Sequence, residues 1–324
     1  MLAEHRYFLR LYRSWDRRLW LRSGHGQETV LEVAAGGGFQ PLPGWPGELA
    51  ALPPYRVVPL PDGTVAGLPE DVSRLLLWRP GAPPVSRALP DGFLARAVTR
   101  ERHGRLWVAG SVPTARSASA SRRHALAMSA DEGRSWLVSE ASHGQLLVSW
   151  FSYFLGAETE YRTVDAVGDQ LVVTSEAGDV EHSSTLVFIR GGEHERWRGR
   201  VLRDDVFRAA LGFEDGHVEV VSHSGRMLRL EQGHRWRPSD LTPRIRQALR
   251  GVEPALPSDA RFEILSADAS PPGERRLLVV SVRAPQRGMA RVGEAVIVLA
   301  ADGDETCFFQ GAPGRELITA CFGG

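Results

Sequence analysis

Arginine offers the most chemistry in this sequence, because all 39 of its basic residues are arginines and lysine is absent. The guanidinium group is planar and binds carboxylate or phosphate groups through two parallel hydrogen bonds. Two segments, residues 111–123 and 283–293, each carry three arginines. They predict either a local positive patch for an anionic partner or ordinary solvated loops in a chain without lysine. These candidate partner-binding residues are Arg116, Arg122, Arg123, Arg283, Arg287 and Arg291.

Patterns for other chemistries are missing from the sequence. The 10 histidines include no His-x-His and no His-Glu-x-x-His spacing, so neither metal-ligand pattern is present. No Gly-x-Ser-x-Gly elbow, phosphate loop or dinucleotide fingerprint occurs. Cys307 and Cys321 match no zinc spacing and indicate free thiols in a reducing compartment, with Cys307 in the core. We therefore expect no catalytic residue, no metal and no cofactor.

The charge balance argues against binding to a polyanion by the molecule as a whole. The 324 residues contain 39 acidic and 39 basic side chains, so the formal net charge is zero. Arginines interrupt residues 1–22, which predicts no secretory signal, and the apolar segment 146–155 is shorter than the roughly 18 residues of a membrane span. We expect a cytoplasmic protein that is monomeric on its own and binds neither nucleic acid nor a membrane.

A repeat organises the whole chain. Six times, a short alternating segment is followed by a tight turn, two further β-rich segments and a Gly-containing turn before an aromatic residue; the third copy has these segments at residues 94–99, 106–109 and 125–129. Four-stranded units without intervening helices are typical of β-propellers. The sequence therefore predicts an all-β, six-bladed β-propeller of four-stranded antiparallel blades in a single domain, 1–324. The expected blades are residues 6–44, 55–90, 93–140, 160–202, 205–240 and 260–322.

In a propeller built from such meanders, the loops between second and third strands are expected on the same face of the propeller as the connections between blades. Long loops there are often kept for binding, and both arginine segments are expected in such loops. A short amphipathic helix is predicted near residues 240–256: Ser239 or Asp240 can cap it, and Ile245, Leu249 and Val252 share one face. Two questions stay open: whether residues 141–158 form an insertion or a seventh blade, and whether residues 316–322 complete the first or the last blade.

One motif has high specificity. Ser129, Asp131, Gly133 and Trp136 match Ser-x-Asp-x-Gly-x-x-Trp at all defining positions. The motif resembles the Asp box of the BNR-repeat, sialidase-like propellers, in which this box is a structural element at the periphery of a blade. The other five repeats resemble it only at a glycine turn and an aromatic residue.

The resemblance does not extend to a sialidase active site. That family uses three arginines around a carboxylate, a tyrosine nucleophile with a glutamate, and an acid/base aspartate. It usually carries a Phe/Tyr-Arg-Ile-Pro segment, whereas the nearest segment here, residues 55–58, lacks the proline.

Two functions follow as hypotheses. The first is a non-catalytic propeller module that binds another protein in an accessory or inhibitory role. The alternative is a sialidase-like glycoside hydrolase or anionic-ligand-binding enzyme built on first-strand arginines. Convergence of three of these arginines with a tyrosine and a glutamate would favour the enzyme. The first-strand arginines are Arg56, Arg96, Arg162 and Arg208.

Overall fold

The chain divides into two compact units, which are described separately. Unit 1 comprises Met1–Arg13, Arg17–Leu42 and Arg208–Gly324, and unit 2 comprises Ser14–Asp16 and Pro43–Phe207. The computed structural model describes residues 9–13, 19–23, 30–33, 39–41, 44–53, 56–69, 73–113, 122–140, 161–167, 170–178, 183–191, 197–202, 205–213, 216–231, 235–270, 275–284, 290–299 and 304–309.

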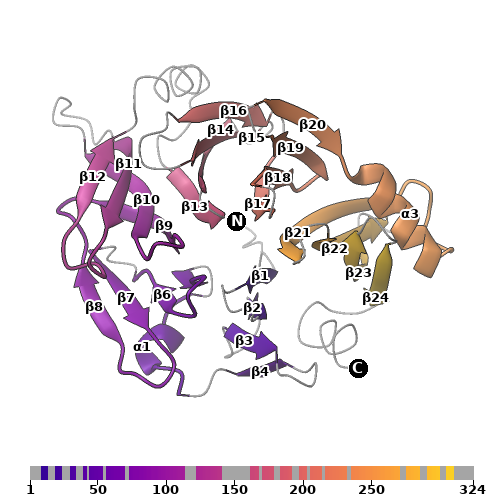
Figure 1. Cartoon of the computed structure of the whole chain (residues 1–324). Coiled ribbons are helices and arrows are strands. Elements are labelled where there is room, and N and C mark those ends of the chain that lie inside the picture. Colours follow the sequence, from indigo (N-terminus) through magenta and orange to yellow (C-terminus); the bar gives the residue numbers. More distant parts are fainter. Residues whose placement is uncertain are drawn as a thin grey trace. The chain divides into compact units, whose positions relative to one another are not determined.

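Unit 1 holds three four-stranded sheets, in each of which the strands are hydrogen-bonded in chain order (Figure 1). The first contains β1 (Leu9–Arg13), β2 (Leu19–Ser23), β3 (Val30–Val33) and β4 (Phe39–Pro41). The second contains β17 (Phe207–Gly212), β18 (Val218–Ser222), β19 (Arg226–Leu230) and β20 (Trp236–Asp240). The third contains β21 (Arg261–Ser270), β22 (Arg275–Ala284), β23 (Ala290–Leu299) and β24 (Glu305–Phe309).

Unit 2 holds three sheets of the same kind. The first contains β5 (Val57–Pro59), β6 (Val65–Gly67), β7 (Arg74–Trp78) and β8 (Val85–Ala88), preceded by a short helix, α1 (Gly47–Ala50). The second contains β9 (Leu94–Arg100), β10 (Leu106–Pro113), β11 (Arg122–Ser129) and β12 (Leu137–Glu140). The third contains β13 (Tyr161–Val167), β14 (Gln170–Gly178), β15 (Ser183–Gly191) and β16 (Arg198–Leu202).

These six meanders confirm the predicted fold class: an all-β, six-bladed β-propeller of four-stranded blades with a short helical insertion. Helix α1 was not predicted. Residues 141–158, 316–322 and Cys321 lie outside the described residues, so the seventh-blade and closing-strand questions stay open. In the described part of the chain, no helix is long and apolar enough to span a membrane.

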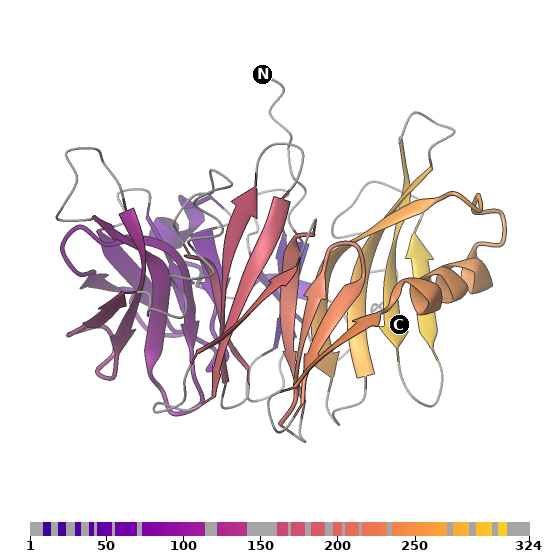
Figure 2. The same cartoon turned by 90° about the horizontal axis from the view of Figure 1, so that it is seen from above.

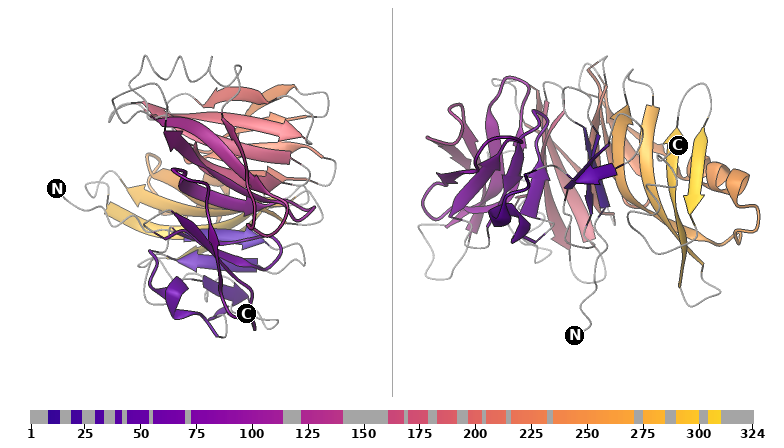
Figure 3. Two further views of the ribbon diagram at one scale, coloured as in Figure 1. Left: turned by 90° about the vertical axis from the view of Figure 1, so that its left-hand side faces the viewer. Right: turned by 90° about the horizontal axis from the view of Figure 1, so that it is seen from below.

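The sheets pack through both faces of their middle strands, as β10 shows. Leu106 and Val108 join an apolar cluster with residues of the β5–β8 sheet. Trp107 and Ala109, which alternate with them, join a second cluster with residues of the β13–β16 sheet. Neighbouring sheets of unit 2 therefore lie face to face (Figure 3). Burial of both faces explains why the middle strands are nearly continuous apolar runs.

Helix α3 (Thr242–Val252) is the predicted insertion and packs against β23 and β24 in unit 1 (Figure 2). The N-cap residue is Leu241 and no side chain caps the helix, so the predicted cap at Ser239 or Asp240 is wrong. Asp240 Oδ1 instead accepts a hydrogen bond from the Thr242 backbone N–H at 2.8 Å in the turn that leads into the helix. Ile245 and Leu249 are buried in the unit 1 core. Val252, predicted for the same face, is instead 42% exposed, because the last turn of the helix extends beyond that core.

Cysteine chemistry departs from the prediction. Cys307, in β24, is disulfide-bonded, so the expected free thiol is wrong for this residue. Disulfides persist mainly in oxidising compartments. The argument for a reducing compartment therefore loses its support, and the cytoplasmic location remains a prediction.

Gly110 permits the closest approach between β9 and β10. The register of the two strands shifts between Ala109 and Gly110, as in a β-bulge. A Cβ atom added at Gly110 would lie 1.9 Å from the Leu94 carbonyl oxygen. A backbone oxygen at that distance cannot be avoided by rotating a side chain.

We predict that Gly110→Ala lowers the free energy of unfolding by about 3 kcal/mol, because the strands must separate to admit the methyl group. Gly251→Ala is the control: its added Cβ meets nothing within 4 Å, and alanine should stabilise α3 by roughly 0.5 kcal/mol. Urea denaturation of both variants measures the difference, and equal midpoints would contradict the prediction.

Candidate functional site

The loop end of the β21–β24 sheet carries a row of arginines. In the strand register, Arg261 of β21 lies opposite Arg283 of β22, and Arg283 lies opposite Arg291 of β23. Like charges directly opposite each other destabilise a sheet. The register therefore brings three arginine positions together at this end of the sheet.

Among the side chains that the structure describes, the carboxylate of Glu263 contacts this arginine row. Glu263 Oε1 lies 2.9 Å from Arg208 Nη2, and Glu263 Oε2 lies 3.5 Å from Arg283 Nη2. Arg208 also donates from Nε to the Ile264 carbonyl oxygen at 3.0 Å. Arg283 keeps 49% of its side chain exposed. Positive charge in this group thus exceeds negative charge, and part of it faces solvent.

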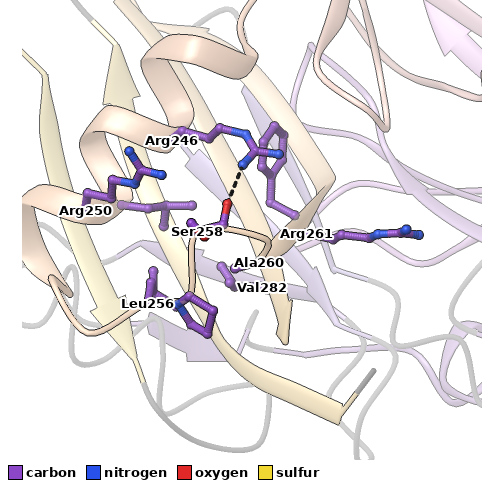
Figure 4. Close-up of a pocket in the computed structure, with 10 residues that line it drawn as sticks. Arg246, Arg250, Leu256, Ser258, Ala260, Arg261 and Val282 are labelled. Carbon is purple, nitrogen blue, oxygen red and sulfur yellow. Dashed lines mark hydrogen bonds between the residues drawn. The ribbon is translucent and has the colours of Figure 1, made fainter. Parts of the chain in front are cut away.

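A pocket lies between α3 and the start of β21 (Figure 4). Its apolar lining includes Leu249, Leu256, Phe262 and Val282. Leu249 and Val282 are buried, whereas Leu256 and Phe262 are partly buried at the edge of the unit 1 core. The lining also includes three arginines and no acidic residue: Arg246, Arg250 and Arg261.

The arginine segments found in the sequence are placed differently from the prediction. Arg122 and Arg123 begin β11, where they lie opposite Pro113 and Val112 of β10. Arg283 and Arg291 also lie in strands, because β22 and β23 continue further than predicted. The assignment of these four residues to loops is therefore wrong, although all four stay at the loop ends of their strands. Arg116 and Arg287 lie outside the described residues.

Of the first-strand arginines considered for an enzyme, Arg56 and Arg208 have described partners within the protein. Arg56 Nη1 donates to the Pro69 carbonyl oxygen at 3.1 Å, and Arg208 pairs with Glu263. Arg96 is exposed. The side chain of Arg162 lies outside the described residues. Arg56 and Arg208 thus bind groups of the protein itself.

The Ser129–Trp136 motif forms a compact hydrogen-bonded turn. Ser129 Oγ accepts from the Gly133 backbone N–H at 2.8 Å. Asp131 Oδ1 accepts from the backbone N–H groups of Arg134 at 3.1 Å and Ser135 at 2.9 Å. Gly133 has a φ of +78°, a conformation that glycine adopts without strain. Each polar group of the motif therefore holds the hairpin between β11 and β12.

The same turn is bound to the neighbouring sheet of unit 2. Trp136 Nε1 donates to the Ala88 carbonyl oxygen at 2.8 Å, and Arg87 Nε donates to the Glu132 carbonyl oxygen at 2.8 Å. Because these bonds join β8 to the β11–β12 turn, the motif contributes to packing between sheets.

Glu132 connects this turn to a buried guanidinium group. Arg100, whose side chain is 3% exposed, binds Glu132 through two hydrogen bonds of 2.6 and 2.7 Å and lies 3.3 Å from Asp62. The hydrogen bonds from Arg100 hold the pKa of Glu132 below its usual value. Glu132 adopts a φ of +60°, which is costly for a residue with a side chain. The two-pronged pair with Arg100 compensates for that cost.

Unit 1 contains a second buried charged cluster, which sequence reasoning missed. Glu219 is fully buried and binds Arg276 through hydrogen bonds of 2.5 and 2.6 Å. His217 Nε2 lies 3.4 Å from Glu219, and the His217 ring stacks on Phe213 at 4.1 Å. Arg276 also lies over the Phe213 ring at 5.2 Å. Because Glu219 comes from β18 and Arg276 from β22, the cluster joins two sheets.

Within the described residues, no group of three or more His, Cys, Asp or Glu side chains is arranged to hold a metal ion. Comparison with family models finds no match for this chain. No curated protein matches it in sequence either.

Several solved structures resemble the chain weakly. A streptogramin B lyase structure has a TM-score of 0.48 at 9% identity and covers 95% of this chain and 84% of its own. Virginiamycin B lyase from Staphylococcus aureus has a TM-score of 0.48 at 11% identity, covering 97% and 88%. The Aleuria aurantia lectin AAL in complex with Fucalpha1-6GlcNAc has a TM-score of 0.47 at 8% identity, covering 95% and 97%. The fold assignment rests on the six sheets described above, and no activity is transferred from these proteins.

We predict a pH-dependent contribution from Asp131. Hydrogen bonds from the Ser135 side chain and backbone and from Ser129 lower its pKa. A carboxyl group whose pKa is lower in the folded protein than in the unfolded chain stabilises the fold at pH values above its unfolded pKa, about 3.9. This stabilisation is lost as the pH falls below that value. Asp131→Asn should therefore lower the urea midpoint at pH 7, and the difference from the unaltered protein should shrink below about pH 4. Exposed Asp91 supplies the control, Asp91→Asn, and a difference for Asp131→Asn that does not change with pH would refute the assignment.

We predict that Glu219→Gln lowers the free energy of unfolding by about 3 kcal/mol, because it leaves the Arg276 charge buried without a carboxylate. The matched change is Glu231→Gln, since Glu231 pairs with Arg237, whose side chain is 60% exposed. That exposed pair should contribute less than about 1 kcal/mol. Similar losses for the two variants in urea denaturation would show that burial does not set the contribution of the Glu219 pair.

Proposed function

We propose that this chain is a non-catalytic β-propeller module that binds another protein in an accessory or inhibitory role. In each unit, the proposed contact surface is the end of the blade at which the loop between the second and third strands opens. The proposed binding residues are Arg116, Arg122 and Arg123 in unit 2 and Arg283, Arg287 and Arg291 in unit 1. We also assign the chain to the Asp-box propellers, on the strength of the hydrogen-bonded turn at Ser129–Trp136.

The observation that carries the proposal is the arginine row of the β21–β24 sheet. The strand register brings three arginine positions together at one end of the sheet, and among the described ion pairs Glu263 is the acidic partner of Arg283. The positive charge attracts carboxylates of a partner, which makes their binding favourable. In unit 2, exposed Arg123 lies at the loop end of β11.

A protein partner fits the net charge better than a nucleic acid does. The molecule as a whole is neutral, so it lacks the long-range positive field that drives association with a polyanion. A local cluster of guanidinium groups instead suits an acidic patch on a folded protein, where two-pronged Arg–carboxylate pairs give specificity.

The test is capture of the tagged protein's partner from cells that make it, followed by titration of the purified partner. The binding variant replaces Arg123, Arg283 and Arg291 with serine. The matched variant replaces Arg134, Arg200 and Arg235, which lie in turns between third and fourth strands or in an outer strand. We expect the binding variant to weaken the affinity at least tenfold, with a strong salt dependence, and the matched variant to leave it unchanged.

Failure to recover a protein, or equal weakening by the two variants, would contradict the proposal. Circular dichroism and urea midpoints of both variants control for folding. Recovery of nucleic acid in place of protein would reject the partner class.

A further inference from the structure

The pocket beside α3 combines an apolar floor with a cationic edge. It is a shallow depression that opens to solvent. Leu249, Leu256, Phe262 and Val282 form the floor, an apolar surface against which one large aliphatic or aromatic side chain can pack. Arg246 crosses one side, where its Nη1 donates to the Ser258 carbonyl oxygen at 3.2 Å and its guanidinium lies 6.0 Å from the Phe262 ring.

Positive charge lies on both sides of this floor. Arg246 and Arg250 are one turn apart on α3, a spacing at which like charges destabilise a helix. Arg261 extends away from the pocket in the opposite direction (Figure 4), because side chains alternate along β21 and Phe262 occupies the pocket side. Arg261 therefore belongs both to the rim of the pocket and to the arginine row with Arg283.

Two of these arginines are available to a ligand. Arg250 and Arg261 are exposed, and neither forms a hydrogen bond or an ion pair with the residues that the structure describes. The acids nearest to them in sequence are Glu253, Asp259 and Glu263, and none of the three lines the pocket. The charged residues that line the pocket are therefore all cationic.

We propose that this pocket binds an extended acidic peptide segment of the partner protein. One large apolar side chain of the segment packs on the pocket floor, and carboxylates before and after it pair with Arg250 and Arg261. The assignment rests on the proposed function, since it names the part of the partner that this face recognises. A peptide suits the site because the two free cations lie on opposite sides of β21, and an extended chain can cross that strand while a compact anion contacts one side.

The experiment is selection of a random heptapeptide phage library on the full-length protein, with an excess of the Arg250→Ser/Arg261→Ser variant present in solution. Phage that bind other surfaces of the protein are captured by the dissolved variant and are washed away. We expect the selected peptides to share one large apolar residue with Asp or Glu on both sides. A fluorescein-labelled consensus peptide should bind the double variant at least tenfold more weakly, and its leucine-to-serine or acid-to-amide analogues should also bind at least tenfold more weakly.

The matched control is Arg200→Ser/Arg235→Ser, which removes two exposed arginines elsewhere and should leave peptide affinity unchanged. No enrichment, enriched peptides without acidic residues, or equal affinity for both double variants would each overturn the pocket assignment. Binding of decanoate without any selected peptide would overturn it too.

The two proposals fail differently. If the captured protein partner binds the Arg250→Ser/Arg261→Ser variant normally but loses affinity for the variant at Arg123, Arg283 and Arg291, the binding face stands and the pocket assignment falls. If a selected acidic peptide binds but no protein partner exists, the proposed function falls.

Discussion

The whole structure depends on covering sheets that are apolar on both faces. Along β10, alternate residues enter two different apolar clusters, so this strand is stable only with a sheet on each side. One face of the β21–β24 sheet is covered by residues of the β17–β20 sheet and of α3. Since burial contributes roughly 25 cal/mol for each Å² of apolar surface, removal of one neighbour would expose a complete face. Repetition of the meander is therefore a condition of stability for each blade.

Arginine has two opposite roles within this framework. Arg100 and Arg276 are largely buried and each binds a carboxylate through two hydrogen bonds, while Arg190 lies between the Trp107 and Trp197 rings at 4.9 and 5.0 Å. These residues join neighbouring sheets, and loss of a partner would leave a buried charge. Arg250 and Arg261 are exposed and unpaired among the described residues. A chain without lysine thus has arginine both in buried structural contacts and at the exposed positions proposed for binding, and the two groups differ in burial.

Much of the fold could be predicted from sequence because its signals are local. Alternation and glycine turns locate the strands, and the spacing from Ser129 to Trp136 anticipates a hydrogen-bonded turn. The charged clusters could not be predicted in this way, since Arg100 and Glu132 are 32 residues apart and Arg276 and Glu219 are 57 apart. All six candidate arginines were assigned to loops, and the four that the structure describes lie in strands, because charged residues at strand ends resemble loop sequence. The pocket was missed because α3, residues 256–262 and Val282 meet only in the folded chain.

The helical insertion joins stability to recognition on a single element. Ile245 and Leu249 point into the core of unit 1, while Arg246 and Arg250, each the next residue along, line the pocket. Adjacent residues of a helix are rotated by about 100°. The orientation of the helix that buries Ile245 and Leu249 therefore also places Arg246 and Arg250 at the pocket. A fold of this kind supports many functions. The insertion buries two apolar residues in the core of unit 1 and, by the same geometry, places two arginines beside the pocket.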